Sequence, residues 1–153
     1  MPWTAAAATL LAAVLGGFGG RDRGGWFGDL ESPEWVPGHA GLAVAWALRL
    51  AASGVAGWWI LDERGWGLTA GLWVAQLAMA CATPALFFGA RRLSTAFTWI
   101  CLEWAAVGLA AAAAWVFIPP AGWLFVGVLA LVTWFGAGAF FIWQLNEPSR
   151  GPV

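Results

Sequence analysis

Five long apolar runs separated by short polar segments set the pattern of hydrophobic and polar positions along the chain. Each run has roughly 18–26 residues, near the ~20 that an α-helix needs to cross about 30 Å of hydrocarbon. No stretch alternates apolar and polar residues with the period of two that is typical of strands. The pattern predicts an all-α membrane protein, a bundle of five transmembrane helices over about residues 3–20, 39–61, 66–89, 93–118 and 121–145.

Glycines, charges and prolines mark where these runs end or bend. Gly19-Gly20 end the first run, residues 62–65 form a tight polar turn, and Pro119-Pro120 precede the last run. Pro84 lies inside the third run, where a proline bends a helix or ends it. The connections after the first loop are short, so we expect the later helices to be antiparallel neighbours within one domain over residues 1–153.

The connection between the first two runs is the one long polar segment, and it extends from Trp26 to His39. It contains three of the eight acidic residues, two prolines and the single histidine of the chain. A long structured connection beside a helix bundle is often functional. We therefore expect this loop to cover a pocket at one end of the bundle.

Composition identifies the solvent around these helices. The chain is 61% hydrophobic and 10% charged, whereas a soluble domain carries about 25% charged residues. It has 14 tryptophans and neither lysine nor tyrosine, so lipid rather than water is expected around most of its surface. Tryptophan, with an apolar body and a polar edge, is typical of the membrane–water boundary. The net charge of −1 and the scattered arginines argue against a nucleic-acid partner.

The arginines also predict an orientation. One end of the predicted bundle carries a single arginine, Arg64. The other end carries five: Arg21, Arg23, Arg91, Arg92 and Arg150. Because cytoplasmic loops carry the excess of positive charge, the first loop and the C-terminus are predicted in the cytoplasm and the N-terminus outside. We expect the protein in the cell (inner or plasma) membrane.

Two charged residues interrupt the apolar runs. Arg49 and Glu103 each lie ten residues into helices that start at the same end, so both lie about 15 Å deep. A central arginine costs about 2.5–3.5 kcal/mol on insertion scales, so we expect both charges to face the bundle interior. Their equal depth predicts a direct ion pair or a polar spot facing a ligand; the alternative is that each lines a small wet gap.

Helical spacing places aromatic residues beside these charges. Trp46, Arg49 and Ser53 share one face, and Trp99 shares a face with Glu103. Two such faces at similar depth are consistent with a pocket lined by tryptophan. From spacing alone, tryptophan as core filler is an equal alternative.

The positions of the cysteines and glycines say less about function. Cys81 and Cys101 lie inside apolar runs and suit neither a disulfide scaffold nor a zinc site, so we expect two buried free thiols and no metal site. GxxxG spacings at residues 16–20 and 67–71 allow close approach of helices within the chain or between protomers.

Several short motifs occur along the chain. The loop reads WFGDLESPEWVP over residues 26–37, and it is followed by Ala45-Trp46, Gln76–Ala78, Thr83–Arg91 and Trp143–Asn146. Together these motifs resemble those of the TspO/MBR family of tryptophan-rich sensory proteins, whose loop signature is W-Y/F-x-x-L-x-x-P-x-W-x-P. The resemblance covers nearly the whole chain, and the combination of motifs is specific.

The resemblance implies a five-helix bundle, often dimeric, with a pocket under the first loop. Members of the family bind porphyrins, haem, sterols and benzodiazepine-site ligands, and some bacterial members promote light-dependent porphyrin breakdown. The two tryptophan positions tied to that breakdown match Trp46 and Trp143. The candidate ligand-binding residues from the loop, the helix faces and the motifs are Trp35, Pro37, His39, Trp46, Arg49, Trp99, Glu103, Trp143 and Asn146.

The chain also departs from the family pattern. Family polar or proline positions are occupied here by Gly38, Leu50, Ala80, Trp99 and Ala139. Arg49 and Glu103 stand where typical members are apolar. The resemblance therefore implies that the fold carries over to a divergent member whose ligand can differ.

Three functions remain open from the sequence. The first is a membrane binding or sensory protein for a flat apolar ligand, either a tetrapyrrole such as porphyrin or haem, or a sterol or isoprenoid. The second is a small accessory subunit of a larger membrane complex, and the third is a light-dependent porphyrin-degrading enzyme. No nucleophile–base constellation is evident, and no required cofactor is predicted. The expected partners are membrane lipid, a small apolar ligand and either a second copy of the chain or a larger complex.

Overall fold

The computed structural model describes residues 3–147, in which all regular secondary structure is helical and no strand is present. The seven helical segments are α1 (Trp3–Gly19), the 3₁₀ segment η1 (Arg23–Asp29), α2 (His39–Glu63), α3 (Leu68–Pro84), the π-helical η2 (Ala85–Gly89), α4 (Leu93–Phe117) and α5 (Pro119–Asn146). The predicted all-α fold is confirmed, with helix ends within a few residues of those expected from the apolar runs.

Four helical segments are long and apolar enough to cross a membrane: α2, α3 continued through η2, α4 and α5. These four predicted spans are confirmed as candidate membrane helices by length and composition. The N-terminal helix α1 is also apolar but has 17 residues, about 26 Å at 1.5 Å per residue. Its crossing of the membrane stays a prediction.

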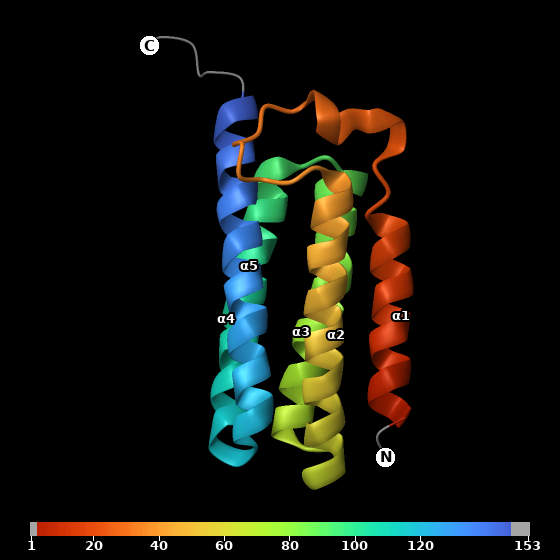
Figure 1. Ribbon diagram of the computed structural model, residues 1–153, viewed down its shortest axis with the longest axis vertical. Helices are drawn as coiled ribbons and strands as arrows, with labels where there is room; N and C mark the ends of the chain where they lie inside the picture. Colours follow the sequence, from red (N-terminus) through yellow and green to blue (C-terminus); the bar gives the residue numbers. More distant parts are fainter. Residues whose placement is uncertain (1–2, 148–153) are drawn as a thin grey trace.

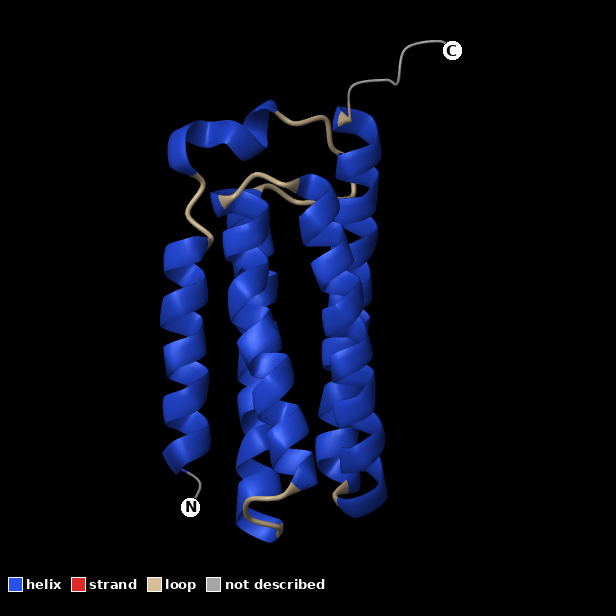
Figure 2. Ribbon diagram, turned by 180° about the vertical axis from the view of Figure 1, so that it is seen from behind, coloured by secondary structure: helices blue, strands red, loops and turns tan. Residues whose placement is uncertain are grey.

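The five α-helices lie side by side with alternating direction (Figure 1). Helix α1 packs against α2 and α3, α4 packs against α3 and α5, and α5 returns to α2. The N-terminal end of α1 lies at one end of the bundle, and the first loop and the C-terminal end of α5 lie at the other (Figures 1 and 2). The predicted antiparallel neighbours are present, although α2 packs more extensively against α5 than against α3.

Large apolar side chains cover the outside of the bundle. The exposed set includes Leu10, Leu11, Val14, Val44, Leu48, Leu109 and Val116. Soluble proteins rarely expose continuous apolar surface on this scale, so these residues suit contact with lipid. The exposed tryptophans Trp3, Trp66 and Trp123 gather at the end away from the loop, as expected for anchors at a membrane boundary.

Two prolines act differently within this bundle. Pro84 ends regular α-helical bonding in α3, and the Ala90 amide then donates to the Ala85 carbonyl in a π-type turn at 2.8 Å. Of the two outcomes predicted for Pro84, a bend or an end, the end of the regular α-helix is the one found. Pro119 begins α5 just after α4 ends at Phe117, because the first turn of a helix does not need its N–H.

The glycines at the end of α1 allow a close approach inside the chain. A Cβ on Gly19 would lie 2.7 Å from the Ala85 Cβ, and one on Gly20 would lie 2.8 Å from the Pro84 Cβ. The GxxxG spacing at residues 16–20 therefore packs α1 onto its own bundle. The second GxxxG spacing, at residues 67–71, faces open space. A helix contact between protomers at this spacing stays a prediction.

Candidate functional site

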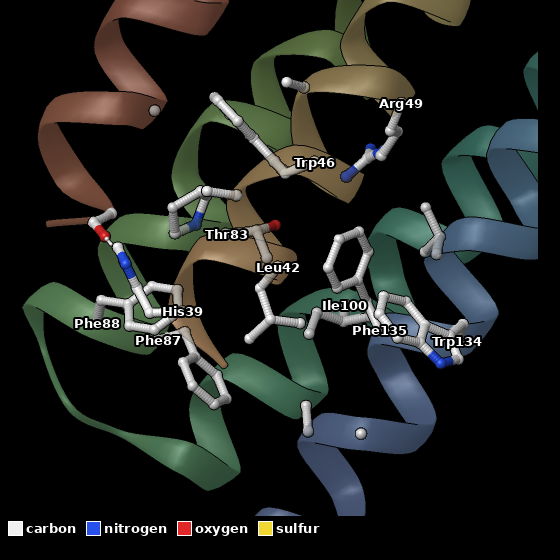
Figure 3. Close-up of a pocket in the computed structure, with 18 of the residues that line it drawn as sticks. His39, Leu42, Trp46, Arg49, Thr83, Phe87, Phe88, Ile100, Trp134 and Phe135 are labelled. Atoms are coloured by element: carbon white, nitrogen blue, oxygen red, sulfur yellow. Dashed lines mark hydrogen bonds between the residues drawn. The ribbon is translucent and has the colours of Figure 1, made fainter. Parts of the chain in front are cut away.

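A cavity of about 400 Å³ lies inside the bundle beneath the first loop (Figure 3). Residues from α1, α2, α3, η2, α4 and α5 contribute to its wall. Most of the wall is apolar, and its aromatic members are Trp35, Trp46, Phe87, Phe88, Trp134 and Phe135. The polar groups concentrate at two places, a mouth near Arg21 and His39 and a floor near Arg49 and Glu103.

Aromatic packing fixes the start of the loop to the bundle. Gly24 and Gly25 adopt positive φ angles of 82° and 70°, which let η1 turn tightly over the end of α1. The Phe27 amide donates to the Asp22 carboxylate at 3.2 Å, and the Phe27 ring packs 5.5 Å from the Phe88 ring. Phe27 is buried, so this half of the loop is anchored by a hydrophobic contact with η2.

One asparagine fixes the middle of the loop to α5. The Glu31 amide donates to Asn146 Oδ1 at 3.0 Å, and Asn146 Nδ2 donates to the Glu31 carbonyl at 2.7 Å. Nearby, the Trp35 ring meets Phe141 edge-on with 6.1 Å between centroids. Figure 1 shows the resulting path, in which the loop runs from α1 across to α5 and back to α2.

His39 closes the loop where α2 begins. Its Nε2–H donates to the Gly20 carbonyl at 2.8 Å, and its ring meets Phe88 edge-on at 4.9 Å (Figure 3). The carbonyl lies just beyond the end of α1, where a helix has unsatisfied acceptors. His39 therefore ties α1 to α2 while one side of its ring lines the mouth of the cavity.

The floor of the cavity carries a buried ion pair. Arg49 Nη2 donates to Glu103 Oε1, and each side chain is 1% exposed. The Thr83 hydroxyl donates to the other carboxylate oxygen at 2.7 Å. The direct pair expected from equal depth is present, and Figure 3 shows Arg49 directed toward the space between Trp46 and Phe135.

A second polar group lies one helical turn beyond the floor. Gln76 Nε2 donates to Ser53 Oγ at 2.5 Å, and Trp73 Nε1 donates to the Ser53 carbonyl at 2.9 Å. These residues are fully buried and do not line the cavity. The face of Trp46, Arg49 and Ser53 therefore does point inward, with its first two members at the cavity.

The Trp46 side chain extends from α2 and contacts both α1 and α3. Its Nε1–H donates to the Ala80 carbonyl of α3 at 3.3 Å, and a Cβ on Gly16 of α1 would collide with its indole ring. The remaining surface of the ring lines the cavity. A glycine at position 16 is required because the indole ring occupies the space that a side chain would fill.

The predicted binding residues fall into two groups. Trp35, His39, Trp46, Arg49 and Glu103 line the cavity, but Pro37, Trp99, Trp143 and Asn146 do not. Trp99 donates to the Met79 carbonyl at 3.1 Å and ties α4 to α3, while Trp143 stacks on Phe97 at 5.9 Å.

The sequence did not single out Trp134 and Phe135 of α5, which form part of the wall. They lie in a run that is apolar on every side, so no local pattern marks them as inward-facing. Phe87, Phe88 and Thr83 were noted only as part of a motif.

The side chains that line the cavity suit the binding and orientation of a ligand. Within residues 3–147, no three His, Cys, Asp or Glu side chains gather in a way that could hold a metal ion. Cys81 and Cys101 are free, as expected, but neither is fully buried: Cys81 is half-buried on α3 and Cys101 is exposed on α4. The site instead offers flat aromatic walls, a cation at each end and one carboxylate.

Comparison with known proteins gives a consistent result. A model of the TspO/MBR family matches residues 5–144. The chain is 33% identical over 162 residues to a translocator protein of Sus scrofa, covering 98% of this chain and 95% of that protein. It is 30% identical to protein CrtK of Rhodobacter capsulatus, covering 85% and 83%, and 27% identical to a tryptophan-rich sensory protein of Cereibacter sphaeroides, covering 71% and 67%.

Proposed function

The chain belongs to the TspO/MBR family of multi-pass membrane proteins, and on that premise we propose that it binds a flat apolar ligand in the cavity beneath its loop. The ligand class is a tetrapyrrole such as porphyrin or haem, or a sterol or isoprenoid. No cofactor is required for this function. The observation that carries the proposal is an apolar, aromatic-walled cavity roofed by a loop that is fastened at both ends.

The dimensions and walls of the cavity support a ligand of this kind. Its volume of about 400 Å³ falls within the range of roughly 300–1,000 Å³ that small-molecule pockets occupy. Trp46 and Phe135 come from different helices and face the same space (Figure 3). A planar ring system gains from offset or edge-on contacts with such side chains in addition to burial of its area.

Placement in the membrane completes the proposal. All five α-helices cross the plasma membrane, α1 included, and lipid covers the exposed apolar side chains. The loop end carries Arg21, Arg23, Arg91 and Arg92, while Arg64 lies at the other end. Arg150, which was counted for the loop end, lies outside the described residues. This excess of arginine supports an orientation with the loop end in the cytoplasm.

A titration with protoporphyrin IX tests ligand binding. We expect saturable quenching of tryptophan fluorescence at micromolar concentration in purified, detergent-solubilised protein. Ala47 is exposed and lines the cavity, whereas Ala51, one turn along the same face of α2, is exposed and does not line it. Ala47→Phe should weaken quenching about tenfold and Ala51→Phe should leave it unchanged; equal effects of the two variants would place the ligand elsewhere.

A further inference from the structure

Arg49 has more hydrogen-bond donors than its protein neighbours accept. A guanidinium carries five N–H groups, and one hydrogen bond, to Glu103, joins Arg49 to another described side chain. Its Nε is buried without a hydrogen-bond partner. Glu103, in contrast, has both oxygens engaged, one by Arg49 and one by Thr83. Arg49 therefore has N–H groups at the floor of the cavity that are available to hydrogen-bond an acceptor.

The cavity wall near Arg49 offers little to these donors. Apart from Thr83, whose hydroxyl already donates to Glu103, most of the side chains that line the cavity are hydrocarbon or aromatic, including Leu42, Ile100, Val132 and Phe135. A buried donor without an acceptor is unfavourable, and more so when it belongs to a charged group. An occupant of the cavity that brings an oxygen to Arg49 removes part of this cost, which an occupant made only of hydrocarbon does not.

Charge decides which kind of oxygen fits. Arg49 and Glu103 already neutralise one another, and both are 1% exposed. A carboxylate at the floor would add a third charge to a site that is net neutral and surrounded by apolar groups, and such a charge is strongly unfavourable. A carbonyl or hydroxyl oxygen accepts the same hydrogen bond without this penalty.

Building on the proposed function, we propose that the ion pair at the floor is a selective subsite for a neutral oxygen acceptor on an otherwise apolar ligand. The ring system of the ligand lies against Trp46 and Phe135, and its carbonyl or hydroxyl group reaches Arg49. Carboxylates of a larger ligand stay at the mouth, where Arg21 is exposed and lines the cavity. Arg49 and Glu103 thus determine specificity.

Three planar probes of one ring system test this subsite: pyrene, 1-acetylpyrene and 1-pyrenecarboxylate. Their dissociation constants are measured with the full chain in detergent micelles by energy transfer from tryptophan to pyrene. A hydrogen bond to a charged donor predicts that 1-acetylpyrene binds about tenfold or more tightly than pyrene. The carboxylate should bind no more tightly than pyrene at this site.

A double variant assigns the preference to the ion pair. Arg49→Leu with Glu103→Leu removes both charges together and leaves neither partner unpaired. In this variant the ratio of the pyrene to the 1-acetylpyrene dissociation constant should fall to about one, whatever the absolute affinities are. Arg64→Leu, at the far end of the bundle, is the control and should leave the advantage intact.

The outcomes separate the two proposals. Equal affinities for pyrene and 1-acetylpyrene in the unmodified protein would overturn the neutral-acceptor subsite and leave cavity binding standing. Tighter binding of the carboxylate that is lost in the double variant would overturn the selection against charge. Absence of saturable binding by all three probes would overturn the proposed function itself. The comparison in the unmodified protein is decisive even where the double variant does not fold.

Discussion

Removing the carboxylate from the buried ion pair should destabilise the bundle severely. In Glu103→Leu, the Arg49 guanidinium loses the carboxylate to which it donates. Arg49 is 1% exposed, and Glu103 is the one described side chain that accepts a hydrogen bond from it, so the substitution leaves the guanidinium without its compensating partner. Thr83 also loses its bond to Glu103 in this variant. Its hydroxyl can still donate to the Met79 carbonyl 3.2 Å away, so the loss of the Thr83–Glu103 bond should add little to the destabilisation.

The expected magnitude follows from burial. Breaking a buried pair by removing one partner costs about 3–5 kcal/mol. For a chain of this size, about 2–4 °C of melting temperature is lost per kcal/mol, so Glu103→Leu should lower the melting temperature by about 6–20 °C. Replacing both partners with leucine is often neutral or stabilising, so Arg49→Leu with Glu103→Leu should recover most of the loss.

Thermal unfolding in detergent, followed by far-ultraviolet circular dichroism, measures these differences. Glu63→Leu is the control, because Glu63 is exposed at the end of α2 and its replacement should change stability by less than about 0.5 kcal/mol. A loss below about 1 kcal/mol for Glu103→Leu, or a double variant no more stable than the single one, would refute the reasoning that Arg49 depends on Glu103 for compensation.

Three further changes test the roof and the wall of the cavity. Asn146→Ala removes both hydrogen bonds to the loop backbone, which together stabilise the closed loop by about 1–3 kcal/mol. This variant should release bound protoporphyrin IX several-fold faster in stopped-flow measurements. Gly16→Ala puts a methyl group into the Trp46 indole and should cost about 1–3 kcal/mol in thermal unfolding, whereas Gly17→Ala faces open space and should cost nothing. Under illumination with bound protoporphyrin IX, Trp46→Phe should slow pigment loss and Trp143→Phe should not, because Trp46 lines the cavity and Trp143 does not; equal rates in the two variants would contradict this placement.

The depth of polar residues was predictable because helices rise by a fixed distance per residue. Counting from the starts of two helices placed Arg49 and Glu103 at one level, and the structure joins them. Proline chemistry likewise located the end of the regular α-helix at Pro84. These features depend on local geometry and on the high cost of leaving a charge in lipid, so the sequence alone specifies them.

The inward face of each helix was harder to predict. In a soluble protein, polar residues mark the outside of a helix, but here lipid-facing and buried positions are both apolar. Trp134 and Phe135 therefore gave no sign that they line the cavity. The same ambiguity applies to Trp99 and Trp143, whose rings pack between helices outside the cavity. Their roles in ligand binding stay predictions.

Long-range pairing of the loop was also beyond sequence patterns. Asn146 stands in a family motif at the end of α5, and nothing local indicates that it holds the backbone of Glu31, 115 residues earlier. This contact forms because the loop crosses the whole bundle end before it returns to α2. The course of the loop in three dimensions determines which backbone groups the Asn146 side chain contacts, and local sequence spacing does not encode that course.

An experimental structure of the full chain with bound protoporphyrin IX tests the central claim most directly. The account predicts density for the planar ring inside the bundle, against Trp46 and Phe135 and beneath the loop held by Asn146. Its carboxylates should lie at the mouth near Arg21. A ring bound on the lipid-facing surface, with the cavity filled by side chains, would contradict the account.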